Sequence, residues 1–107
     1  MFAVIYSFKV KTGKEEDFLE AWSGLTKLIY QYEGSYGSRL HRYKPDEYIA
    51  YAQWPDRKTW EESGGSLPEE AKVFSKSMQA SCTSIETLHS MEVEADLLMK
   101  TPFSDKL

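Results

Sequence analysis

The order of the predicted elements indicates an α+β fold of the ferredoxin-like type, with a four-stranded antiparallel sheet that carries helices on one face. The sequence patterns follow one another as strand, helix, strand, strand, a pair of helices and strand (βαββαβ). Two of the strands, residues 2–10 and 48–54, are apolar on both alternating sides, so both of their faces need cover. Helices can cover only one face. We therefore expect a second copy of the chain to cover the other, as a two-fold symmetric homodimer.

The first strand and the first helix follow clear patterns. Residues 2–10 place aromatic and aliphatic side chains on both sides of an extended chain. Residues 18–32 repeat apolar side chains at helical spacing and leave polar residues on the opposite side. Thr12 and Glu15 have the spacing of a capping box, so we expect Thr12 to cap this helix. Gly34 is expected to end it.

The middle of the chain predicts a hairpin and a short helix. Residues 35–44 are polar enough for an edge strand, and a Lys-Pro-Asp-Glu turn connects them to the strand over residues 48–54. Pro55 ends that strand because it has no N–H to donate. Asp56 is expected to cap a short helix over residues 56–63, which a pair of glycines then breaks.

The last two elements are a helix and a strand. Ser66 and Glu69 again have capping-box spacing and predict a helix that runs to about residue 83. Its buried side is expected to contain Ala71, Phe74, Met78 and Cys82. The fourth strand is expected over residues 91–98, where apolar and acidic residues alternate.

Composition limits the classes of function. The net charge is −4, which argues against nucleic acid or an anionic membrane as a partner, because both need a basic face. Cys82 is the only cysteine, has no basic neighbour and is expected to be inert core in a reducing compartment. No leader and no apolar run of about 18 residues is found, so we expect a cytoplasmic protein. Residues 1–99 are predicted to form one domain and residues 100–107 a tail.

Three segments carry a resemblance to a known family. They are residues 8–18 (FKVKTGKEEDF), residues 37–42 (GSRLHR) and residues 51–60 (YAQWPDRKTW), and together they resemble the antibiotic biosynthesis monooxygenase family. The resemblance extends over residues 2–98 and implies a dimeric α/β barrel. It also implies a small oxygenase that converts phenols to quinones with no metal, flavin or other cofactor, in which the protein helps to remove a proton, holds the anion and excludes water.

Such a reaction needs an aromatic pocket between sheet and helices. His41 is the candidate base, and Arg39 or Gln53 the candidate group that steadies an oxyanion. Arg39 and His41 lie on one side of their strand and Leu40 and Arg42 on the other, and the sequence leaves open which side faces the helices. The predicted ligand pocket consists of Tyr6, Tyr51, Gln53, Trp54, Trp60, Phe74 and Met78. Of these, Trp60 is the residue we most expect to contact a ligand.

Each candidate also has a structural interpretation. His41 would then be a half-exposed histidine on an edge strand, Trp54 and Trp60 would pack the corner between strand and helix, and the helical residues would be core. The function that corresponds to this interpretation is a non-catalytic dimeric domain that binds a small ligand or supports another protein. A cavity of roughly several hundred cubic ångströms with a polar wall would favour the enzyme.

A related branch of the superfamily degrades haem, and similarity to it would imply an Asn in the first strand and a His on the second helical segment. Tyr6 occupies that strand position here, the chain contains no Asn, and no His lies between Pro55 and Leu88. Haem degradation is therefore not expected, because the axial ligand is missing. Metal-binding Cys/His spacing, a phosphate-binding glycine loop and a Gly-x-Ser-x-Gly motif are not found, and no metal site is expected.

Overall fold

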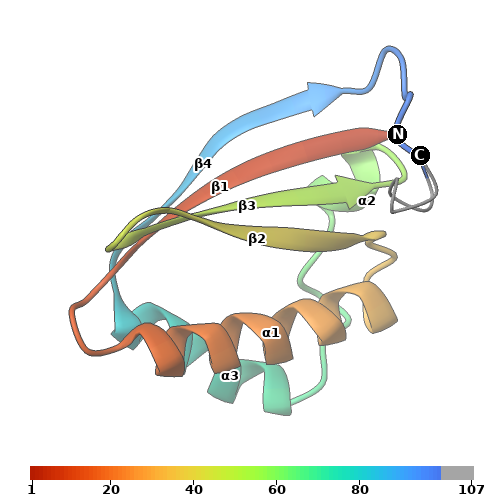
Figure 1. The fold of residues 1–107 in the computed structure, drawn as a ribbon. Helices are drawn as coiled ribbons and strands as arrows, with labels where there is room; N and C mark the ends of the chain where they lie inside the picture. Colours follow the sequence, from red (N-terminus) through yellow and green to blue (C-terminus); the bar gives the residue numbers. More distant parts are fainter. Residues whose placement is uncertain (100–107) are drawn as a thin grey trace, which may run out of the picture.

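A computed structural model describes residues 1–99 and shows a sheet with α1 and α3 on one face (Figure 1). The elements are β1 (Phe2–Val10), α1 (Glu15–Tyr32), β2 (Gly37–Lys44), β3 (Glu47–Trp54), α2 (Arg57–Glu61), α3 (Glu70–Ser81) and β4 (Cys82–Glu92). The four strands are ordered β2-β3-β1-β4, and all neighbours are antiparallel. The ferredoxin-like fold is thus confirmed. The predicted tail, residues 100–107, lies outside the described residues.

The alternation of side chains along β3 explains where the helices pack. Tyr48, Ala50, Ala52 and Trp54 are buried on the helix side, whereas the residues between them are only partly buried on the opposite face. Across the sheet Ala50 pairs with Tyr6, so a small side chain lies beside a large one. This arrangement leaves room for aromatic rings between the sheet and α1.

The core consists of two clusters between the sheet and the helices. One contains Phe8, Val10, Phe18, Tyr48, Ala50 and Cys82, and the other contains Phe2, Val4, Ala52 and Trp54. Phe18 of α1 is completely buried, and its ring lies 5.2 Å from the rings of both Phe8 and Tyr48. Burial of one such side chain contributes about 1.5–3 kcal/mol. Tyr6 packs against both clusters and connects them.

Two of the three predicted helix caps are wrong. The residue before α1 is Lys14 rather than Thr12, and the Glu15 carboxylate instead accepts the Gly13 N–H at 2.8 and 3.0 Å. α3 begins at Glu70, and the Ser66 N–H donates to Glu33 Oε1 at 2.9 Å. In both loops the backbone groups find partners other than a capping hydroxyl.

The third cap and the end of α1 are confirmed. The Asp56 carboxylate accepts the N–H and the hydroxyl of Thr59, both at 2.8 Å, and so caps α2. α2 is shorter than predicted and ends at Glu61. After α1, Gly34 has a φ of 80°, which a residue with a side chain rarely adopts.

The fourth strand differs most from the prediction. β4 spans Cys82–Glu92 instead of residues 91–98, and α3 ends at Ser81, so Cys82 belongs to the strand. β4 is an edge strand whose side chains are mostly exposed, and its pairing with β1 contains a bulge opposite Ile5 and Tyr6. A strand with little buried surface and a break in its alternation has no clear period-two pattern, which explains the error.

Beyond β4 the chain continues to the other face of the sheet. The Val93 N–H donates to the Met1 carbonyl at 2.9 Å, and residues 93–98 then pass near Arg39 and Tyr51. Within residues 1–99, the structure contains no helix long and apolar enough to span a membrane.

Candidate functional site

The structure answers the question about the two sides of β2. Leu40 packs against the core, and the Arg42 guanidinium donates to the Tyr48 hydroxyl at 3.2 Å, so this side faces the helices. Arg39 and His41 alternate with these residues and therefore lie on the opposite side, where Arg39 pairs with Tyr51. We call this opposite side, which faces away from α1 and α3, the outer face.

A cavity of about 230 Å³ lies between the sheet and the helices. Its wall consists of Tyr6, Phe8, Trp22, Leu25, Thr26, Ile29, Ser38, Ala52, Trp54, Met78 and Ile85. Most of these side chains are apolar, and the polar groups are the Thr26 and Ser38 hydroxyls, the Tyr6 phenol and the Trp54 indole. A cavity of about 150 Å³ already holds benzene, so this one has room for a substituted ring or two fused rings.

Trp54 lines this cavity and carries a buried, unpaired hydrogen-bond donor. Its side chain is 3% exposed, and its Nε1 has no hydrogen-bond partner among residues 1–99. An unpaired buried N–H of this kind costs roughly 1–3 kcal/mol. The position follows from the sequence, because Trp54 is the last residue of β3, on the helix side, and Pro55 ends the strand directly after it. The Trp54 residue lines the cavity, but Nε1 itself is buried from the cavity as well as from solvent, so the indole N–H reaches a ligand oxygen only when a neighbouring side chain moves.

Tyr6 and Trp60 form a hydrogen-bonded pair next to the same cavity. Trp60 Nε1 donates to the Tyr6 hydroxyl oxygen at 2.8 Å, and the Trp60 ring packs on Phe2 with 5.6 Å between ring centroids. Tyr6 lines the cavity, whereas Trp60 is not part of the wall. Burial raises the pKa of Tyr6 above its ordinary value and outweighs the opposing effect of the Trp60 hydrogen bond, so the phenol keeps its proton near neutral pH.

The two predicted pocket residues of α3 have different positions. Met78 lines the cavity, but Phe74 packs between α1 and α3. A Cβ at Gly24 would lie 2.5 Å from the Phe74 ring, so the ring occupies the space that the glycine leaves open. Sequence reasoning assigned the apolar stripe of α1 to the core alone, although Trp22, Leu25 and Ile29 also line the cavity. Their helical spacing showed burial but could not separate a cavity wall from filled core.

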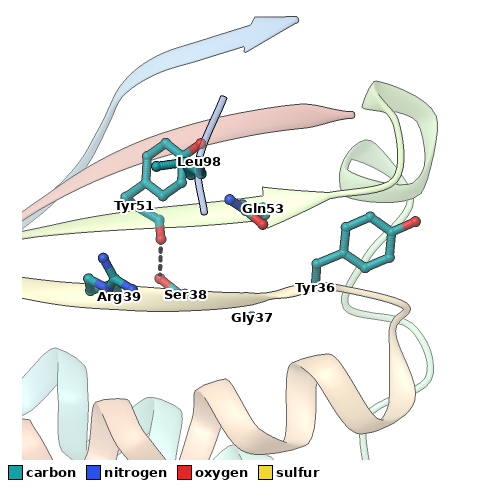
Figure 2. Close-up of a pocket in the computed structure, with 7 residues that line it drawn as sticks. All are labelled: Tyr36, Gly37, Ser38, Arg39, Tyr51, Gln53 and Leu98. Atoms are coloured by element: carbon teal, nitrogen blue, oxygen red, sulfur yellow. Dashed lines mark hydrogen bonds between the residues drawn. The ribbon is translucent and has the colours of Figure 1, made fainter. Parts of the chain in front are cut away.

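The other predicted site residues lie on the outer face. Arg39, Tyr51 and Gln53 line a hollow of about 220 Å³ together with Tyr36, Gly37, Ser38 and Leu98. Figure 2 shows Tyr51 and Leu98 on the side of the sheet away from α1. An adjoining hollow of about 640 Å³ is lined by Arg39, His41, Tyr51 and the chain that follows β4.

The sheet therefore separates the predicted catalytic residues from the predicted aromatic wall. His41 is exposed, and its Nδ1 lies 3.1 Å from the Ile49 carbonyl oxygen, to which the ring N–H donates. Arg39 and His41 cannot reach the inner cavity of the same chain, because β2 directs Ser38 and Leu40 there instead. Cys82 is buried, and burial raises the pKa of its thiol, which suits the predicted inert core position.

No group of three or more His, Cys, Asp or Glu side chains that could hold a metal ion is found in the part of the chain that the structure describes.

Comparison with known proteins identifies the family. The family model for antibiotic biosynthesis monooxygenase matches residues 1–77, and the chain belongs to this family. The resemblance expected from the three sequence segments is thereby confirmed. A comparison with curated proteins finds no match.

Solved structures share the fold at low sequence identity. SnoaB from Streptomyces nogalater, a cofactor-independent oxygenase, is 14% identical, with a TM-score of 0.71 over 90% of this chain and 95% of that chain. A protein from Deinococcus radiodurans that carries the family name has a TM-score of 0.72 at 7% identity, over 94% of this chain and 100% of its own. One from Caulobacter crescentus is 20% identical, with a TM-score of 0.66 over 85% and 90% of the two chains.

Proposed function

We propose that this chain is a monooxygenase that works without a cofactor and oxidises a small aromatic or quinol-type compound between its sheet and its helices. The observation that carries the proposal is the largely apolar cavity of about 230 Å³ between sheet and helices, whose lining residue Trp54 carries a buried N–H without a partner among residues 1–99. Apolar walls bind a flat ring, and an unpaired donor binds an oxygen atom. The fold shared with SnoaB, a cofactor-independent oxygenase, supports the same class of reaction.

The wall of the cavity restricts the substrate. Among the residues that the structure describes, no carboxylate and no imidazole lines it. The substrate must then supply an acidic proton of its own, as a phenol does, or a CH2 group between an aromatic ring and a carbonyl. A hydrogen bond from Trp54 to the substrate oxygen favours the anion and so lowers the pKa of that proton. The volume of about 230 Å³ favours compounds of one or two rings over larger ones.

The reaction balances without a bound cofactor. The substrate CH2 group or phenol O–H loses a proton, and the resulting anion, whose charge spreads onto the carbon that will be oxidised, transfers one electron to O2. The carbon radical and superoxide combine to form a C–O bond, and one further proton gives a hydroperoxide. Loss of the hydrogen that remains on that carbon, with cleavage of the O–O bond, releases water and leaves a carbonyl group. One oxygen atom enters the product and the other leaves as water.

His41 and Arg39 remain proposed as a base and an anion-steadying group, but for the hollow on the outer face. Both side chains line it together with Tyr51. His41→Ala distinguishes the two locations. If the chemistry takes place in the inner cavity, the variant keeps the turnover of the unmodified protein.

Oxygen uptake on a panel of acidic aromatic compounds tests the function. The panel contains one-, two- and three-ring phenols and ketones with a benzylic CH2, up to anthrone. We expect uptake of one O2 per product carbonyl, at a higher rate than in a heat-treated sample. The rate should be highest for compounds of one or two rings. If no compound is turned over faster than in the heat-treated control, the oxygenase proposal fails. Binding of the same compounds without turnover would support the non-catalytic ligand-binding alternative.

We also propose that the protein is a homodimer through the outer face and is cytoplasmic. Ile5, Ile49 and Tyr51 lie on that face, Ile5 pairs with Tyr51 across the strands, and all three are only partly buried in the single chain. A second copy would cover these side chains. The reduced, buried thiol of Cys82 suits a reducing compartment.

A further inference from the structure

The hydrogen bond between Trp60 and Tyr6 determines which way the Tyr6 hydroxyl can donate. An indole N–H is only a donor, so the Tyr6 oxygen must be the acceptor in the 2.8 Å contact. The phenol has a single proton, which then has to point away from Trp60. Among residues 1–99, no acceptor is hydrogen-bonded to Tyr6. Because Tyr6 lines the cavity, an oxygen atom inside the cavity could accept that proton.

Trp60 is held firmly enough to fix this direction. The Asp56 carboxylate caps α2 through two contacts of 2.8 Å to Thr59, next to Trp60 in the chain. The Trp60 ring packs on the completely buried Phe2, and the Arg57 guanidinium lies 4.7 Å from the centre of the Phe2 ring. Both ends of this short helix are thus attached to β1, the strand that carries Tyr6.

We propose that Tyr6 is a specificity-determining donor that selects aromatic ligands with an acceptor oxygen, and that Trp60 is the positioning residue that aims it. This inference rests on the proposed function, because it assumes that the cavity takes an aromatic compound. It adds a second donor to that of Trp54. The ligand class is therefore an aromatic ketone, quinone or phenolate, in preference to a hydrocarbon ring or an aromatic amine.

The backbone positions of the two donors lie well apart along the sheet. Trp54 pairs with Phe2, and Tyr6 lies four residues further along β1, a distance of about 13 Å at 3.3–3.4 Å per residue. Both side chains nevertheless line one cavity. The two donors therefore act on different parts of a bound molecule, and each is expected to contribute its own share of selectivity.

The test compares two probes of nearly equal shape by calorimetry, 1-tetralone and its carbonyl-free analogue tetralin. We expect the unmodified protein to prefer tetralone. Tyr6→Phe, which removes only the hydroxyl, should weaken tetralone binding by roughly 3- to 10-fold and leave tetralin binding unchanged. Tyr43→Phe, at an exposed position on β2, is the matched control and should change neither.

A structural role for Trp60 gives a different result from a positioning role. Trp60→Phe keeps a ring on Phe2 but removes the N–H, so it should lower the preference for tetralone and leave tetralin binding intact. In the double variant with Tyr6→Phe no further preference should be lost, because both changes remove the same directed proton. The infrared carbonyl band of bound tetralone should move to higher frequency in both single variants.

Three outcomes overturn the proposal, and they can be told apart. Equal tetralone binding by Tyr6→Phe and the unmodified protein rejects the role of Tyr6 and leaves the proposed function standing. Equal weakening of both probes by Trp60→Phe shows that Trp60 only supports the fold. Failure of the unmodified protein to bind either probe rejects the inference together with the aromatic ligand of the proposed function. Unfolding curves of each variant verify that the fold is retained.

Discussion

The side chains with the most chemical consequence in this protein are two neutral donors, Trp54 and Tyr6. Each lacks an acceptor for one polar hydrogen among residues 1–99, and each lines the same cavity. A buried donor without an acceptor destabilises the fold, whereas one that binds a ligand oxygen is stabilised in the complex. Arg39 and His41, which the sequence first suggested, lie on the other side of the sheet.

Replacement of Trp54 by Phe tests the first of these donors. The indole N–H is lost, while most of the ring area in the cavity wall is kept. A hydrogen bond to a charged oxygen contributes about 1.5–3 kcal/mol, so kcat/KM for the best compound of the panel should fall about 10- to 100-fold. The free energy of unfolding should change by less than about 1 kcal/mol, because the lost volume and the removed unpaired donor have opposite effects.

Steady-state oxygen uptake and urea unfolding of the same samples separate these effects. If Trp54→Phe keeps full kcat/KM, the indole does not stabilise an anion, and the main support for the enzyme is removed. A large loss of stability would instead indicate that Trp54 acts through packing.

At the scale of the elements, the contact between α1 and α3 depends on a single small residue. Gly24 in the middle of α1 leaves space for the Phe74 ring, because a Cβ there would lie 2.5 Å from it. Gly24→Ala should improve helix propensity by about 1 kcal/mol, yet the overlap should cost about 1–3 kcal/mol. We expect a net destabilisation of roughly 1 kcal/mol, measured as a lower midpoint in urea.

A control variant and a rescue variant test whether overlap with the Phe74 ring causes the destabilisation. At Gly65 an added Cβ would meet nothing within 4 Å, so Gly65→Ala should have little effect. Adding Phe74→Leu to Gly24→Ala should restore part of the lost stability, since the smaller side chain can move away from the new methyl group. A Gly24→Ala protein more stable than the parent would show that the two helices are free to separate.

The sequence predicted those elements whose side chains are buried on a regular period. β1, α1 and β3 each carry such a pattern, and their positions agree with the prediction to within a few residues. β4 was misplaced because an exposed edge strand with a bulge has no such period. The sequence did not determine which side of β2 faces the helices. Arg39 and His41 alternate with Leu40 and Arg42, and only the packed structure shows which pair meets the helices.

The candidate site was predictable only in part, for a related physical reason. Tyr6, Trp54 and Met78 were expected in the pocket and do line the cavity, because their apolar faces already indicated burial. Which polar hydrogens remain unpaired depends on distances of a few tenths of an ångström, and residue spacing does not determine these. The hydrogen bond between Trp60 and Tyr6 joins residues 54 positions apart in the sequence, and no local pattern indicates it.

For the molecule as a whole, the two faces of the sheet differ in how well they are covered. The helix side contains both core clusters, whereas Ile5, Ile49 and Tyr51 on the outer face remain partly exposed. Ile5 pairs with Tyr51 across β1 and β3, and Ile49 lies two residues from Tyr51 on the same side of β3. A stable interface usually buries about 800 Å² on each partner, and a two-fold sheet contact is the simplest way to cover such a face.

A charge at the centre of the outer face should therefore separate the two copies. Ile49→Lys places an ammonium group where the partner's apolar side chains would lie, which costs several kcal/mol if it remains buried and unpaired. Light scattering at micromolar concentration should give twice the chain mass of 12.4 kDa for the parent and the single mass for this variant. Val73→Lys, at a 68% exposed position on α3, is the control and should remain dimeric. The core lies on the other side of the sheet, so the Ile49→Lys variant should keep its fold. A parent protein of single mass, or an Ile49→Lys variant of double mass, would show that this face is not the interface.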